Sequence, residues 1–290
     1  MNVILSSNYD RTYFEFIPMV VRIWNKLLPE ANIHLLLVDK HRWDKRYIET
    51  IENLPKIHVH YIESRNLYSG RIAKISRLAK AVSLDGFSII HDIDSAPLSK
   101  DYIDYVYSNY RNGKVTCIGF EVYEHIADEK GKFPMGWLSG KGEDFKNMLG
   151  LSSRNFSEVM DELIEKSIKS TDSPWPYTNI NNKKDSIEGF SDESLLAYLV
   201  YKFGSNKYQN KITRNPNPTS PIHVWAPKHC MPRSKPDLWK ITNITSETYE
   251  ANLIRPLGPN LKFNAIILIH VFKKYSFEAN EIGLFPYEDM

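Results

Sequence analysis

Short apolar runs alternate with longer amphipathic segments in the first third of the chain. In the longer segments apolar residues such as Ile17, Val20 and Trp24 recur every three or four positions, the period of a helix with one buried face. The pattern predicts strands at 3–6, 33–38, 57–62 and 87–90, and helices at 10–28, 43–54 and 71–83. Strands that alternate with helices favour a mostly parallel, Rossmann-like α/β sheet, in which ligands bind beyond the carboxyl ends of the strands.

The remainder of the chain is less regular. A helix around 99–107, a strand at 115–120 and a helix near 143–149 are predicted, and 192–201 has the pattern of a further helix. Residues 133–140 and 171–190 are expected to form loops, the second long enough for a lid. Six prolines between 216 and 236 favour an irregular C-terminal wrap over a sheet.

Composition and charge exclude several classes of protein. Apolar residues make up 42% of the chain and aromatic residues 12%, enough for a sizeable core, and the net charge of +2 leaves no basic footprint for nucleic acid. Cys117 lies in an apolar run and Cys230 in the proline-rich stretch, so a disulfide framework is not expected. No signal peptide and no membrane-spanning run is recognisable. We therefore expect a cytoplasmic protein with no transmembrane segment.

The most informative pattern is the apolar run 87–90 followed by Asp92 and Asp94. A short continuous apolar run indicates a strand covered on both faces, which places the two acids at its exposed carboxyl end. Residues i and i+2 of an extended chain point the same way, so both carboxylates are expected to face one ion. Oxygen ligands suit Mg²⁺ or Mn²⁺, and such ions complete their shells with water and substrate phosphates. The alternative is a turn with a helix cap before Pro97.

Three segments together resemble a known family. These are residues 6–9 after the first strand, the basic helix 71–80, and 92–98 with its two aspartates. They look like the nucleotide-sugar-dependent glycosyltransferases of the GT-A fold. The wider layout, including 8–18, Arg233 and 253–256, is similar to the small glycosyltransferases of large DNA viruses of algae.

The resemblance implies a single GT-A catalytic domain over 1–290. Its nucleotide-binding half would be 1–110, its donor-sugar and acceptor half 111–240, and its C-terminal extension 241–290. The implied activity is Leloir-type transfer of a hexosyl or pentosyl group from a nucleotide sugar to a hydroxyl of a glycan or glycoprotein acceptor. A UDP-sugar is favoured because UDP is common in the family. Asp94 is implied to bind Mn²⁺ or Mg²⁺, and Asp92 to contact the ribose or the same metal.

Several further residues are expected to contact the donor. By their spacing of three, Arg71, Lys74 and Arg77 share one helix face, and a basic face beside two carboxylates can neutralise diphosphate or hold the base and ribose. The resemblance supports this role for Lys74 and Arg77, and a solvated basic face is the alternative for each residue. The loop with Gly136, Trp137 and Ser139 resembles the family segment that lines the donor sugar, although a glycine turn with a core tryptophan has the same pattern. Ser6, Asn8 and Arg233 complete the expected donor-binding set.

A catalytic acid and a third metal ligand are also implied. Asp192, and after it Glu193, open a predicted helix; in inverting relatives an acid there is the general base, and in retaining ones it binds sugar hydroxyls. Acids also favour a helix N-terminus for electrostatic reasons alone. His223 and His229 are the candidates for a third protein ligand to the metal.

Two rival functions remain open at the level of sequence. Haloacid-dehalogenase-like phosphohydrolases also use two aspartates spaced by one, but after their first strand rather than a fourth. A non-catalytic module that binds sugar nucleotides or glycans would keep the aromatic loops without the base. A dinucleotide oxidoreductase is not favoured, because no GxGxxG motif follows the first strand.

Overall fold

The computed structural model describes a little over half of the chain. These are residues 1–65, 67–108, 110–118, 135–136, 138–171, 196, 222–225, 229–231, 248–253, 255, 260 and 264. The chain forms two compact units that interleave along the sequence. Unit 1 comprises Met1–Ile4, Ser64–His91 and Asn109–Ala226, and unit 2 comprises Leu5–Glu63, Asp92–Ser108 and Pro227–Met290. The expected division into 1–110, 111–240 and 241–290 stays a prediction.

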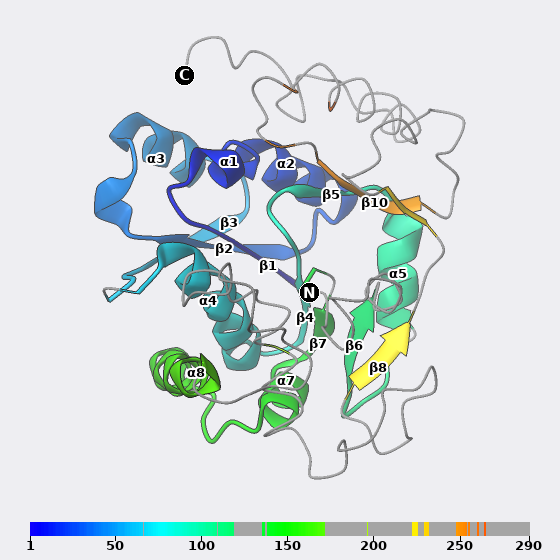
Figure 1. Ribbon diagram of the computed structural model, residues 1–290. Coiled ribbons are helices and arrows are strands. Elements are labelled where there is room, and N and C mark those ends of the chain that lie inside the picture. The colour runs from blue at the N-terminus through cyan, green and yellow to red at the C-terminus, as the bar shows by residue number, and fades with distance from the viewer. Residues whose placement is uncertain are drawn as a thin grey trace, which may run out of the picture. The chain divides into compact units, whose positions relative to one another are not determined.

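The larger sheet of the described residues is mixed but mostly parallel (Figure 1). Its strand order is β3-β2-β1-β4-β7-β6-β8. The bounds are β1 Asn2–Ser7, β2 Asn32–Val38, β3 Ile57–Ile62, β4 Phe87–Ile90, β6 Val115–Ile118, β7 Leu138–Lys141 and β8 Ile222–Trp225. The pairs β2–β3, β1–β4 and β6–β8 are parallel, whereas β7 is antiparallel to both β4 and β6. Helices flank this sheet, so the predicted α/β fold class is confirmed.

Strand β7 corrects one expectation. Residues 138–140 were expected in a loop, but Leu138–Lys141 pairs with β4 on one side and β6 on the other. The strand is short and contains a serine and a glycine, so it lacks the apolar run that marks a buried strand. Its pairing partners, rather than its own residues, make it a strand.

In the N-terminal part of unit 2, helices α1 (Arg11–Phe14), α2 (Ile17–Leu27) and α3 (Lys45–Glu52) lie on one side of β2 and β3 (Figure 1). These helices and η1 (Lys40–Arg42) lie between the strands in sequence. The single helix expected over 10–28 is in fact two helices. Asp10 caps α1, because its Oδ1 accepts a hydrogen bond from the amide of Thr12 at 2.9 Å. A separate helix, α2, begins at Ile17 with Pro18 in its first turn, where the missing amide hydrogen of a proline costs no helical hydrogen bond. The apolar face of α2 is fully buried around Trp24.

A second sheet of unit 2 brings distant segments together. Its strand order is β5-β10-β9, with β5 at Ser95–Pro97, β9 at His229–Met231 and β10 at Thr248–Asn252. Strand β10 is antiparallel to β5, with Asn252 opposite Ser95, and helix α5 (Lys100–Ser108) follows β5. Part of the expected C-terminal wrap is therefore sheet.

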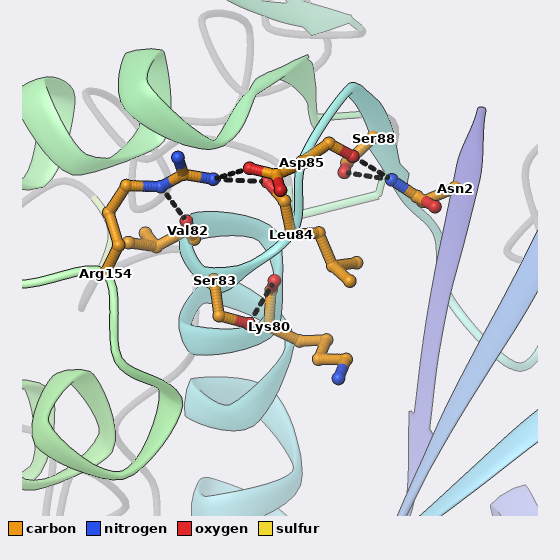
Figure 2. A network of polar contacts seen from close by, with 8 residues as sticks. All are labelled: Asn2, Lys80, Val82, Ser83, Leu84, Asp85, Ser88 and Arg154. Atoms are coloured by element: carbon orange, nitrogen blue, oxygen red, sulfur yellow. Dashed lines mark hydrogen bonds and ion pairs between the residues drawn. The ribbon is translucent and has the colours of Figure 1, made fainter.

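Unit 1 is built around helix α4 (Ser69–Ser83). It packs against α7 (Gly142–Leu149) and α8 (Phe156–Thr171), and also contacts β4. Sequence analysis did not predict α8. The C-terminal end of α4 is held by Arg154, which donates hydrogen bonds to the carbonyl oxygens of Val82 at 3.0 Å and Leu84 at 2.7 Å (Figure 2). These contacts join the loop before α8 to the end of α4.

Candidate functional site

Asp92 and Asp94 lie in a turn immediately beyond the carboxyl end of β4. The amide of His91 donates to the carbonyl of Ile4 at 3.0 Å, which extends the β1–β4 pairing by one residue. The chain then turns, and the amide of Ser95 donates to the carbonyl of Asp92 at 3.3 Å. The sequence analysis placed the acids correctly beyond the strand but wrongly assumed an extended chain between them.

The turn places the two acids in different surroundings. Asp92 is half-buried, whereas only 7% of Asp94 is exposed. A buried carboxylate requires a cation or hydrogen-bond donors, because removing its charge from water is costly. Asp94 has such a partner: Arg255 Nε lies 3.2 Å from Asp94 Oδ2.

Arg255 also stacks on an aromatic ring of the same unit. Its guanidinium carbon is 4.7 Å from the ring centroid of Tyr13, in helix α1. Main-chain contacts hold the segment in place, since the amide of Leu253 donates to the carbonyl of Asp94 at 2.8 Å. The sequence analysis noted 253–256 as part of a resemblance but gave Arg255 no role. No local pattern links positions 94 and 255, so only the folded chain reveals the pair.

The loop after β1 is fixed by its own polar side chains. Ser6 lies in β1 and Asn8 directly follows that strand. Each residue is only 7% exposed. The carbonyl of Asn8 accepts from Ser7 Oγ at 2.9 Å, and Asn8 Oδ1 accepts from the amide of Asp10 at 3.4 Å. Asn8 therefore shapes the turn that leads into α1. Its expected role toward the donor stays a prediction.

The basic residues of α4 are more buried than a solvated face allows. Arg71 is 5% exposed and its Nη2 donates to the carbonyl of Ser167 in α8 at 2.7 Å. Burial lowers the pKa of the Arg71 guanidinium. Arg77 is 4% exposed and its Nη1 donates to the carbonyl of His91 at 3.0 Å, at the residue that precedes Asp92. Lys74, between them, is half-buried. The solvated-face alternative is therefore wrong for both arginines.

The remaining expected residues divide between described and undescribed parts of the chain. Ser139 lies in β7, fully buried opposite Ile89 and Thr116, and its hydroxyl has no hydrogen-bond partner among the described residues. Gly136 is half-buried in the turn before β7. The other expected residues, Trp137, Asp192, Glu193 and Arg233, lie outside the described residues.

The two candidate histidine ligands belong to different sheets. His223 is in β8, opposite Thr116, and His229 is in β9, opposite Thr248. Among the described residues no group of three or more histidine, cysteine or acidic side chains is arranged to hold a metal ion. The third metal ligand stays a prediction.

Comparison with known proteins identifies the fold. No model of a protein family matches the sequence, and no curated protein is significantly similar to it. Among solved structures, the galactosyltransferase LgtC in complex with donor and acceptor sugar analogues has a TM-score of 0.58 at 10% identity, over 99% of this chain and 98% of that one. An active-site mutant of LgtC has a TM-score of 0.52 at 10% identity, over 87% of each chain.

A second glycosyltransferase has a similar structure. GlyE of Streptococcus pneumoniae TIGR4 has a TM-score of 0.50 at 11% identity, over 97% of this chain and 62% of that one. At such identities the likeness establishes the fold alone, which is the GT-A fold expected from the sequence. Within the described residues, no helix combines the length and apolarity needed to cross a membrane.

Proposed function

We propose that this chain is a metal-dependent glycosyltransferase. It would move a hexosyl or pentosyl group from a nucleoside-diphosphate sugar, with a UDP-sugar favoured, to a hydroxyl of a glycan or glycoprotein. The main support is the turn with Asp92 and Asp94 beyond the carboxyl end of β4, on a fold similar to that of solved glycosyltransferases. This edge of a parallel α/β sheet is where ligands bind.

The chemistry of the turn fits a hard divalent cation. Asp92 and Asp94 offer carboxylate oxygens, the ligands that Mg²⁺ and Mn²⁺ prefer. Asp94 already attracts a cation, because Arg255 lies 3.2 Å from its Oδ2. Asp92 and Asp94 would hold the ion, and water and donor phosphates would complete its shell. His223 or His229 would be the third protein ligand.

The proposed reaction places charge on a departing nucleoside diphosphate. A divalent ion held by Asp92 and Asp94 would supply electrostatic stabilisation of that leaving group. Asp94 contributes a carboxylate fixed by burial and by the main-chain bond from Leu253 to its carbonyl. Arg77 anchors the carbonyl of His91 and so restrains the main chain entering the turn. Asp192, or Glu193 in its place, would accept the acceptor's hydroxyl proton in an inverting reaction.

Donor recognition is proposed for a wider set of side chains. Arg71 has the least support among them, because its guanidinium already bonds the carbonyl of Ser167. The full proposed donor-binding set is Ser6, Asn8, Arg71, Lys74, Arg77, Asp92, Gly136, Trp137, Ser139 and Arg233.

Calorimetry of UDP and UDP-sugar binding, with Mn²⁺ or with EDTA, tests the metal role. We expect the wild type to bind at least about tenfold more tightly with Mn²⁺, a difference of about 1.4 kcal/mol. Asp94→Asn should abolish this metal dependence and Asp92→Asn should weaken it. Asp104→Asn is the matched control, because Asp104 is an exposed carboxylate of unit 2 that lies 2.6 Å from Lys100, four residues earlier in the same helix.

Metal-dependent binding that survives in Asp94→Asn would contradict the proposal. Turnover separates it from its rivals, measured as UDP released from a panel of UDP-sugars with glycan acceptors. Phosphate released from phosphate esters would indicate the phosphohydrolase instead. Donor binding without any turnover across the panel would indicate a binding module.

A further inference from the structure

Among the described residues, the Arg255 side chain contacts Asp94 and the ring of Tyr13, both of unit 2. Its Nε is 3.2 Å from Asp94 Oδ2, and its guanidinium lies over the Tyr13 ring at 4.7 Å. The side chain of Arg255 is 26% exposed and that of Asp94 is 11% exposed, so solvent reaches the cation more than the carboxylate. The ion pair is therefore partly shielded from water, while part of the Arg255 side chain remains accessible to solvent.

A divalent ion and this guanidinium cannot both approach Asp94 Oδ2 closely. A metal–oxygen bond is about 2.0–2.2 Å long, so an ion on that oxygen would lie within a few ångströms of the positively charged guanidinium. Like charges at such a distance repel strongly where water is partly excluded. Arg255 can therefore reduce this repulsion only by moving away from the carboxylate.

We propose that Arg255 is a tethered cation that neutralises Asp94 in the metal-free protein and is displaced when a divalent ion binds, so that it sets the metal affinity of the site. This inference rests on the proposed function, because it takes Asp94 as a metal ligand. The Tyr13 ring provides a place where the displaced guanidinium remains stabilised by a cation–π contact. The main-chain bond from Leu253 to Asp94 keeps Arg255 nearby throughout.

A purely structural ion pair makes the opposite prediction. If Arg255 served only to fix the C-terminal segment against the turn, removing it would loosen Asp94, and Mn²⁺ would bind equally well or more weakly. If Arg255 competes with the ion, removing it must tighten Mn²⁺ binding. The sign of the change therefore separates the two roles.

The test is Mn²⁺ binding to the full chain, without nucleotide, followed by the electron paramagnetic resonance signal of free Mn²⁺. We expect Arg255→Gln to lower the dissociation constant about tenfold, the effect of losing one charge-assisted contact, about 1.4 kcal/mol. The dissociation constant of Arg255→Lys should lie between those of the wild type and Arg255→Gln, because lysine keeps the charge but not the planar guanidinium. Arg42→Gln is the matched control: exposed Arg42 also stacks on a tyrosine of unit 2, Tyr9, at 3.7 Å.

An unchanged or higher dissociation constant in Arg255→Gln overturns the inference, as does an equal tightening in Arg42→Gln. If Arg255→Gln does not fold, Arg255→Lys provides the test. An Mn²⁺ dissociation constant of Arg255→Lys equal to that of the wild type then overturns the inference. Asp94→Asn distinguishes the two proposals. If it binds Mn²⁺ as the wild type does, the metal role of Asp94 fails. If it loses Mn²⁺ while Arg255→Gln has no effect, only the Arg255 inference fails.

Discussion

Arg154 is expected to contribute about 2–3 kcal/mol to the stability of the protein by holding the end of α4 (Figure 2). The last carbonyls of a helix lack partners within it. Arg154 donates to two carbonyls in this region, those of Val82 at 3.0 Å and Leu84 at 2.7 Å. A hydrogen bond from a charged donor is worth about 1.5–3 kcal/mol when buried, and the 36% exposure of Arg154 favours the lower end for each.

The third contact of Arg154 supplies an internal control. Its Nη2 lies 3.0 Å from Asp85 Oδ1, but the Asp85 side chain is 97% exposed. An ion pair in water contributes about 0–1 kcal/mol. Asp85→Asn should therefore change the free energy of unfolding little, whereas Arg154→Ala should lower it by about 2–3 kcal/mol.

Urea denaturation followed by circular dichroism measures the free energy of unfolding of Asp85→Asn and Arg154→Ala. A second perturbation of the same contact is Gly142→Ala, because an added Cβ would lie 2.5 Å from the Leu84 carbonyl, 2.6 Å from that of Val82 and 2.7 Å from Arg154 Nη2. We expect it to destabilise the protein as well. If the free energy of unfolding of Arg154→Ala lies within about 0.5 kcal/mol of the wild-type value, the two hydrogen bonds to carbonyls do not hold α4 and the reasoning is refuted.

Two further predictions concern the contacts of α8. Arg71→Ala should lower the free energy of unfolding by about 2 kcal/mol, because it removes a buried charge-assisted hydrogen bond to an α8 carbonyl. Arg65→Ala breaks a half-exposed ion pair to the same helix and should lower it by less than about 1 kcal/mol. Equal losses of stability for the two variants in urea titrations would contradict this. The pKa of Glu162 is lowered: burial opposes the shift, but hydrogen bonds from Lys166 and Ser152 outweigh it. A carboxyl whose folded pKa is depressed stabilises the fold above its ordinary value of 4.5, and that contribution is lost as the pH falls through the folded pKa. The stability difference between wild type and Glu162→Gln should therefore shrink with acidification, and a difference that does not vary with pH would exclude the mechanism.

The sequence determined the parts of this protein that depend on short-range periodicity. Apolar runs located β1 to β4 closely, and apolar spacing located α3 and α4. The same local pattern placed Asp92 and Asp94 beyond a buried strand, which is the basis of the proposed function. These features were predictable because burial on one or both faces of an element imposes its pattern on neighbouring residues.

Tertiary structure decided what depends on residues far apart in the chain. Strand β7 has no strand-like pattern and exists through its pairing with β4 and β6. The spacing placed Arg71 on a basic helix face that would meet the donor or solvent, but α8 covers it and accepts its hydrogen bond. Arg255 reaches Asp94 only because β10 pairs with β5 beside the turn. Contacts across such separations leave no periodic trace in a single sequence, because each partner's surroundings are set by segments that the local pattern does not contain.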